Sequence, residues 1–134
     1  MHLSSLAVAV FACCGFSLWK YWTPYNNLHD IKAVFNPTAR TTTVSFYYLN
    51  SFASLVDYKM TQEGSERRGH RYCLTLISQY VGRRPHKINP QIRPAGDAKT
   101  QVTILMGQFE PDKDTIFYRD RKGTYPIPVD VQIQ

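Results

Sequence analysis

The sequence predicts an α+β domain that follows a single N-terminal transmembrane helix. Three observations lead to this prediction. Residues 3–19 carry no charge, residues 65–81 repeat apolar side chains at helical spacing, and several later segments alternate apolar and polar side chains as half-buried strands do. We therefore expect a membrane anchor at residues 1–22, an extended connector at 23–40, and a small domain at 41–134. That domain would pack one or two helices on a mostly antiparallel sheet.

The uncharged start of the chain is the basis for the anchor. Seventeen uncharged residues in a helix reach roughly 26 Å, just enough to cross the hydrocarbon core of a bilayer. Aromatic rings at its end suit the headgroup layer. The anchor residues would be Leu3, Leu6, Val8, Val10, Phe11, Phe16, Leu18, Trp19 and Trp22.

A cleaved secretory signal is the alternative explanation of the same segment. Small residues near position 14 could form a cleavage site, but no lysine or arginine precedes the apolar stretch. Cleavage would make the protein a secreted or periplasmic binding module. Against export, Cys73 is the only cysteine after residue 14, so the domain cannot form an internal disulfide, and Pro37 blocks the one glycosylation-like sequence.

The domain itself is predicted to begin with a strand and two helices. Residues 41–49 alternate β-forming side chains, which predicts a strand. Asn50 could cap a short helix that ends near Gly64. Residues 65–81 predict the main helix, because Cys73, Leu76, Ile77 and Tyr80 fall on one helical face and Gly82 follows as a stop signal.

Period-two patterns then predict strands at residues 87–92, 101–108 and 114–119. A turn at residues 120–123 leads into the last strand, whose prolines suit the edge of a sheet. An exposed edge of this kind can pair with a strand of a partner protein. The apolar residues of this edge strand are Ile127, Val129, Val131 and Ile133.

Positive charge is concentrated in one part of the chain, whose formal net charge is +6. Residues 67–93 contain no acidic side chain. Such a basic patch could meet an acidic protein partner or anionic lipid, or it could simply be a solvated face. We do not expect nucleic acid, because no recognised binding motif accompanies the patch. The patch comprises Arg67, Arg68, Arg71, Arg83, Arg84, Lys87 and Arg93.

No residue pattern predicts catalysis, a metal site or a cofactor. His70 and Cys73 would lie on neighbouring helical turns, with His86 as the nearest third ligand, but a buried free cysteine is the more common outcome. A Cys–His nucleophile would need an exposed, electropositive thiol. Acidic residues at positions 110, 112 and 114 read as a solvated turn, and no glycine-rich phosphate loop is present. We expect a protein that is not an enzyme.

The predicted order of one helix and four strands resembles the cytochrome c oxidase assembly factor 1 family, which shares its fold with the inner-membrane translocase subunit 21. Residues 80–85 match the helix end, and residues 114–118 and 121–123 match a strand and turn before the final strand. The resemblance covers residues 65–134. It implies a single-pass protein of the mitochondrial inner membrane that acts as a non-catalytic accessory or assembly subunit of a respiratory-chain complex. Its partners would be the membrane and other subunits.

Overall fold

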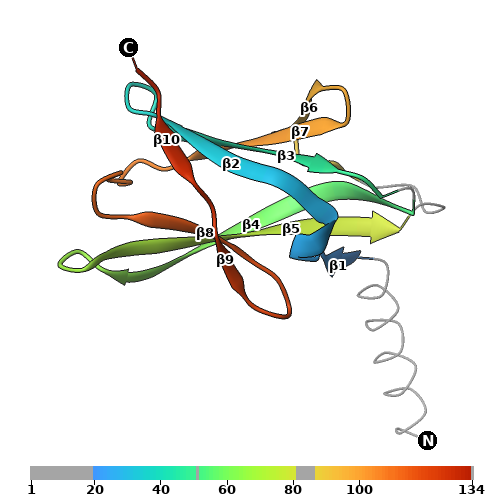
Figure 1. Cartoon of the computed structure of the whole chain (residues 1–134), viewed down its shortest axis with the longest axis horizontal. Coiled ribbons are helices and arrows are strands. Elements are labelled where there is room, and N and C mark those ends of the chain that lie inside the picture. The colour runs from blue at the N-terminus through green and yellow to red at the C-terminus, as the bar shows by residue number, and fades with distance from the viewer. Residues whose placement is uncertain (1–19, 51, 81–86, 134) are drawn as a thin grey trace, which may run out of the picture.

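Two five-stranded β-sheets packed face to face form the domain in the computed structural model, which describes residues 20–50, 52–80 and 87–133 (Figure 1). The elements in chain order are β1 (Lys20–Trp22), the 3₁₀ helix η1 (Tyr25–Asn27), β2 (Leu28–Asn36), β3 (Thr41–Tyr48), β4 (Ala53–Ser65), β5 (Gly69–Tyr80), β6 (Ile92–Gly96), β7 (Lys99–Leu105), β8 (Thr115–Arg119), β9 (Thr124–Pro126) and β10 (Val129–Val131).

Sheet A is organised around β5. Strand β4 pairs antiparallel with β5 along its whole length. The other side of β5 is shared by β1, which is antiparallel near Ile77, and by β8, which is parallel from Arg71 to Leu74. Strand β9 then pairs with β8. Sheet A is therefore bounded by β4 on one side and by β9 and β1 on the other.

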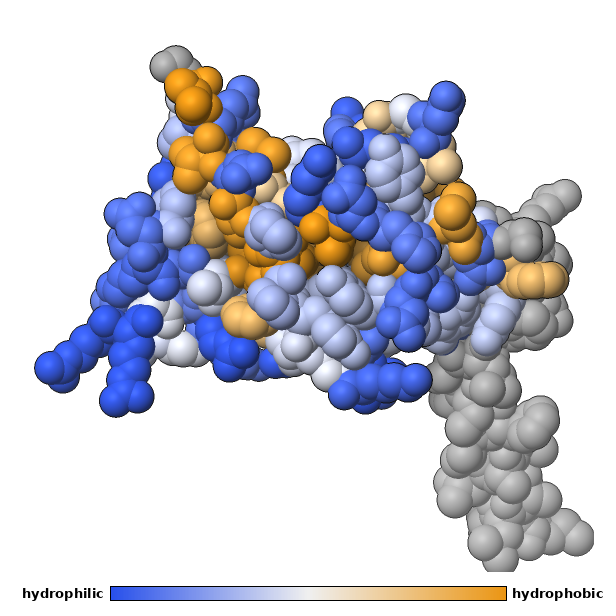
Figure 2. Space-filling view, in the orientation of Figure 1, coloured by the Kyte–Doolittle hydropathy of each residue, from blue (hydrophilic) through white to orange (hydrophobic). Residues whose placement is uncertain are grey.

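Sheet B has the order β10-β2-β3-β7-β6. All its pairs are antiparallel except β10 with β2. In Figure 1 it forms the upper layer and sheet A the lower one, and Figure 2 shows apolar side chains gathered between the two layers. Its edges are β10 and β6.

The core forms because alternate residues of both sheets point inward. Val44 and Phe46 of β3 meet Leu74 and Leu76 of β5, and all four side chains are 0 % exposed. Burying each large apolar side chain contributes roughly 1.5–3 kcal/mol relative to leaving it in water. The core is thus an inter-sheet layer, and among the described residues no α-helix contributes to it, although Tyr25 of η1 packs against it.

The predicted α+β fold is therefore wrong. The main helix expected at residues 65–81 is instead the end of β4, a turn and β5. Strand β5 lies inside sheet A and is buried on both faces, with Cys73 and Thr75 as buried as Leu74 and Leu76. A strand buried on both faces reads as a continuous apolar run, and such a run also contains helical spacings.

The first predicted helix is also a strand. Asn50 does not cap a helix: its side-chain oxygen accepts a hydrogen bond from the backbone N–H of Phe52 at 2.8 Å, which makes a turn into β4. A register irregularity between Leu55 and Asp57 places two adjacent apolar residues inward. In the sequence, the adjacent apolar residues Leu55 and Val56 therefore resembled part of the apolar face of a helix.

The prediction of a transmembrane helix is corrected as well. In the part of the chain that the structure describes, no helix is long and apolar enough to cross a membrane. The anchor residues from Leu3 to Trp19 lie outside the described residues. Trp22, the last of the predicted anchor residues, belongs to β1 and pairs with Ile77.

Several strands were predicted correctly. The strand expected at residues 41–49 is β3, and those at 101–108 and 114–119 correspond to β7 and β8. The strand expected at residues 87–92 is displaced and begins only at Ile92. Residues 23–40, the expected connector, contribute η1 and β2 to the sandwich.

Candidate functional site: the cationic face of sheet A

The outer face of sheet A gathers positive side chains from four segments of the chain. The register sets Lys59 of β4 beside Thr75 of β5, and Glu63 beside Arg71. Side chains of a strand alternate between faces, so these odd-numbered residues all point away from the core. We call this surface the cationic face and define it by Trp22, Lys59, Glu63, Arg71, Phe117, Arg119 and Arg121.

Two aromatic rings support three of these cations. The ammonium of Lys59 lies 4.7 Å from the centre of the Trp22 ring, and the guanidinium of Arg121 lies 4.3 Å from it. The guanidinium of Arg71 lies 4.5 Å from the centre of the Phe117 ring. A cation held over an aromatic face loses little of its charge but much of its freedom, so these side chains are partly positioned for a partner.

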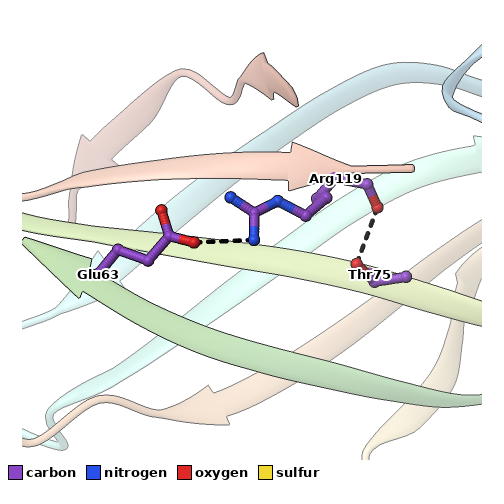
Figure 3. A network of polar contacts seen from close by, with 3 residues as sticks. All are labelled: Glu63, Thr75 and Arg119. Atoms are coloured by element: carbon purple, nitrogen blue, oxygen red, sulfur yellow. Dashed lines mark hydrogen bonds and ion pairs between the residues drawn. The ribbon is translucent and has the colours of Figure 1, made fainter. Parts of the chain in front are cut away.

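The fourth cation is held by an ion pair. Arg119 Nη1 lies 2.9 Å from Glu63 Oε1, and the carbonyl oxygen of Arg119 accepts a hydrogen bond from Thr75 Oγ1 at 2.8 Å (Figure 3). The hydrogen bond from Arg119 lowers the pKa of Glu63, and the same contact raises the pKa of Arg119. Both groups stay charged at neutral pH, so the residues that define the face carry four cations and one carboxylate. Exposed Asp57, two residues before Lys59 on the same face of β4, adds a second carboxylate beside them.

Cys73 lies beneath this face, where its buried thiol is not placed to act as a nucleophile. Its side chain is 1 % exposed, and burial raises the pKa of its thiol. His70 lies three positions before Cys73 on β5, so the two side chains belong to opposite faces of the sheet. These two side chains would be neighbours only if residues 65–81 formed a helix. No group of three potential metal ligands occurs among the residues that the structure describes.

The basic patch from the sequence is divided by the fold. Arg67 and Arg68 lie in the exposed turn between β4 and β5, and Arg71 lies on the cationic face. Arg93 lies on β6 of the other sheet, and exposed Lys87 precedes that strand. Arg83 and Arg84 fall outside the described residues. One member of the patch therefore contributes to the candidate site.

Sequence reasoning missed most of the cationic face. Lys59, Arg119 and Arg121 are distant from one another along the chain and were not grouped, and Trp22 was assigned to the anchor. The only usable signal was the alternation of charged residues with buried or partly buried ones, at positions 57 and 59 in one segment and at 119 and 121 in the other. That signal becomes meaningful only once β4 and β8 are known to flank β5.

The predicted edge strand occupies the end of sheet B. Strand β10 pairs only with β2 among the described strands, so its other side is an edge. Ile127 precedes it and is 4 % exposed, Val129 packs against the core, and Val131 is 46 % exposed. Ile133 follows the strand and is 95 % exposed. The alternating apolar side chains therefore begin in the core at Ile127 and end at the surface at Ile133.

A cleft of about 430 Å³ lies at one end of the sandwich, lined by Arg40, Glu66, His70, Gly107, Gln108, Glu110, Lys113 and Asp114. Asp114, one of the acidic residues noted in the sequence, accepts hydrogen bonds there from the backbone N–H groups of His70 at 2.7 Å and Glu110 at 2.9 Å. It therefore joins the start of β5 to the β7–β8 loop. The cleft mixes both signs of charge and selects no ligand class as clearly as the cationic face does.

Comparisons with known proteins add no relative. No family model matches the chain, and neither the curated proteins nor the solved structures include a match. The cationic face and the β-sandwich therefore carry the functional argument by themselves.

Proposed function

We propose that this protein is a non-catalytic docking module, an accessory subunit of a larger assembly, which binds an acidic surface of a partner protein. The observation that carries the proposal is the cationic face: four cations on the outer surface of one sheet, three of them over aromatic rings, against the carboxylates of Glu63 and neighbouring Asp57. Arginine and aromatic residues are the side chains most enriched where proteins bind each other.

A protein partner fits this face better than nucleic acid. Proteins that bind single strands stack bases on open aromatic rings. Here the Trp22 ring already has Lys59 and Arg121 over it, and the Phe117 ring has Arg71 over it. The cations are therefore the groups presented to a partner, and carboxylates are their complement.

A lipid surface is also less suited to this face. Proteins that settle on bilayers combine cations with apolar side chains that enter the lipid. The large exposed hydrophobic residues of the described chain do not belong to the cationic face; they are Val34, Leu49, Phe52, Tyr80, Ile88, Leu105, Val131 and Ile133. Anionic headgroups remain an outcome that the test below would reveal.

Two biological settings agree with a docking module. The first is a respiratory-chain partner, which the resemblance implied, although the helix on which that resemblance depended is strand β5. The second is a partner outside the cell or in the periplasm, where a cleaved signal segment would place the same face. The intact mass of the protein from its native source separates them: loss of the first fifteen to twenty residues, roughly the length of a signal segment, supports the second setting.

The experiment compares two double variants of equal charge. Arg71→Gln/Arg121→Gln removes two cations from the face, and Lys87→Gln/Arg93→Gln removes two exposed cations elsewhere. We expect the first variant to bind a polyglutamate peptide between about twofold and thirtyfold more weakly than wild type, since each exposed ion pair contributes roughly 0.2–1 kcal/mol. The second variant should bind as wild type does, and added salt should weaken wild-type binding.

Affinity capture from the native source provides the decisive comparison. A partner retained by wild type and by Lys87→Gln/Arg93→Gln, but lost with Arg71→Gln/Arg121→Gln, supports the proposal. Equal loss with both variants contradicts it, because net charge alone would then explain binding. Binding of cardiolipin-containing vesicles or a single-stranded oligonucleotide in preference to the peptide would contradict the choice of an acidic protein.

A further inference from the structure

Strand β4 has a long edge that is not paired with another strand in the described chain. All its residues except Val56, which lies at the register irregularity, pair with β5 on one side. On the other side, the N–H of Asn89 donates to the Val56 carbonyl at 2.8 Å, and the Asn89 side-chain amide donates to Asp57 Oδ1 at 2.9 Å. This loop covers the edge as far as Asp57. Among the described strands, none pairs with this side of β4 from Lys59 to Ser65; at residue 58, the Tyr58 N–H already donates to Asp57 Oδ1 at 2.8 Å.

An open edge of this length is a template for another strand. Many proteins protect such an edge with proline, a bulge or charged side chains, especially lysine. The open part of β4 contains no proline and no register irregularity, and its two charged residues, Lys59 and Glu63, have opposite signs. They lie two residues on either side of Thr61. When a second copy of this edge runs antiparallel to the first, the lysine of each copy can therefore lie opposite the glutamate of the other.

We propose that a second copy of this chain pairs with β4, antiparallel and about a twofold axis through Thr61. Lys59 of each copy then lies directly opposite Glu63 of the other, and the two Thr61 side chains face each other. Met60 lies opposite Gln62 on the inner face. Directly opposed residues of antiparallel strands interact most strongly, and opposite charges and threonine pairs are favourable there.

Charge selects this register over its neighbour. An axis through Met60 would place Asp57 opposite Glu63 twice, and like charges directly opposed are destabilising. It would also require the edge at Asp57, which Asn89 already occupies. The axis through Thr61 centres the pairing on residues 59–63, which no other described strand pairs with on this side. It creates two Lys–Glu pairs and no repulsive pair.

The pairing would join the two copies of sheet A into one continuous sheet. Opposed residues of antiparallel strands point to the same face, so both cationic faces would lie on one side of the dimer. Glu63 would then lie between Arg119 of its own chain, at 2.9 Å, and Lys59 of the second copy, whose ammonium would turn from its own Trp22 ring toward the carboxylate. The dimer does not depend on the proposed function, although two joined faces would strengthen binding to a partner with repeated acidic sites.

Charge exchange tests the dimer. The full chain is studied by sedimentation equilibrium in a mild detergent that keeps its apolar first nineteen residues dispersed. We expect reversible dimerisation of wild type. Lys59→Glu should weaken it by about tenfold or more, since two attractive pairs become two repulsive ones. Adding Glu63→Lys to this variant should restore it, because both pairs return with their signs exchanged.

Two further variants separate the interface from net charge and from folding. Lys87→Glu makes the same charge change at an exposed residue away from β4 and should leave the dimer unchanged. Thr61→Arg places two positive charges on the axis without altering Lys59 or Glu63 and should weaken the dimer. Urea unfolding of each variant establishes that the domain is folded.

The outcomes are distinct. Restoration by the double exchange, with loss in Thr61→Arg, supports pairing through β4. A monomeric wild type at all concentrations overturns the proposal. So does a dimer that Lys59→Glu leaves unchanged, or one that the double exchange does not restore while the variants remain folded. The peptide-binding test of the cationic face uses other residues, so failure of either proposal is visible separately.

Discussion

Removing a single oxygen atom from the core is expected to destabilise the domain. The ring of Tyr118 is 0 % exposed in the core. Its hydroxyl donates to the backbone carbonyl of Thr23 and accepts the N–H of Leu76 at 3.4 Å. Burial raises the pKa of Tyr118 well above its usual range, so the hydroxyl keeps its proton and remains a donor. This hydroxyl therefore ties the segment after β1 to β5 and β8.

The magnitude of the effect follows from what Tyr118→Phe removes and what it keeps. Phenylalanine retains the ring, so no large cavity forms. The Thr23 carbonyl loses its donor and the Leu76 N–H loses its acceptor, in a place that water does not reach. Leaving buried polar groups unsatisfied costs roughly 1–3 kcal/mol. We expect a loss of about 2 kcal/mol in the free energy of unfolding, or about thirtyfold in the equilibrium constant.

Urea unfolding of the full chain measures this loss. With a slope of about 1–3 kcal/mol/M, the midpoint should fall by about 1 M. Tyr125→Phe is the matched control, because the Tyr125 ring stacks on Tyr25 with centres 4.2 Å apart and its hydroxyl has no hydrogen-bond partner among the described residues. That change should stay within about 0.5 kcal/mol. Equal effects of the two replacements would refute the role assigned to the buried hydroxyl.

Three other perturbations have defined outcomes. Stability should fall as the pH rises above 10, because burial raises the pKa of Tyr48 to about 12 while an unfolded tyrosine loses its proton near 10. Urea midpoints measured across this pH range should fall less steeply in Tyr48→Phe. For Asp120, three backbone N–H groups at 2.8–2.9 Å outweigh burial and lower its pKa; its contribution is present at neutral pH and lost as the pH falls below about 4, and Asp120→Asn should lower the thermal midpoint and flatten this dependence. Gly69→Ala should destabilise the protein by more than Gly96→Ala in urea. Both have positive φ, +95° and +134°, but an added Cβ meets a backbone oxygen at 2.2 Å only at Gly69.

Each of these predictions has an opposite result that would contradict its reasoning. A pH dependence above 10 that is identical in wild type and Tyr48→Phe would show that other groups cause it. An unchanged acid profile in Asp120→Asn would mean that the carboxylate is not held by the three N–H groups in solution. Equal losses for the two glycine variants would leave backbone strain as the only effect and dispute the close contact at Gly69.

Element type was predictable from the sequence where a strand has one wet face. β3 alternates Val44 and Phe46, both 0 % exposed, with partly exposed residues, and it was recognised from that alternation. β5 was not recognised, because neighbours in sheet A cover its outer residues Cys73 and Thr75 as completely as the core covers Leu74. An apolar run of this kind does not reveal its period without knowledge of what lies on each side.

The residues of the candidate site likewise divide into one that the sequence identified and others that only the structure brought together. The sequence identified Arg71 as part of an acid-free basic region, and the structure places it on the cationic face. Arg119 and Lys59 were not identified, because they meet Arg71 only through pairing of β4 and β8 with β5. Contacts between residues so far apart in the chain depend on strand register, and local patterns contain no information about it.

The sequence alone determined that the described chain contains alternating strands, an excess of positive charge and a single buried thiol. These follow from composition and from the two-residue period, which are local properties. Only the tertiary structure decided that residues 69–80 form a central strand, that the cations converge over Trp22 and Phe117, and that one side of β4 is largely unpaired among the described strands. The physical reason is that burial on both faces, cross-strand neighbours and free edges are properties of a sheet, and they do not exist until its strands have paired.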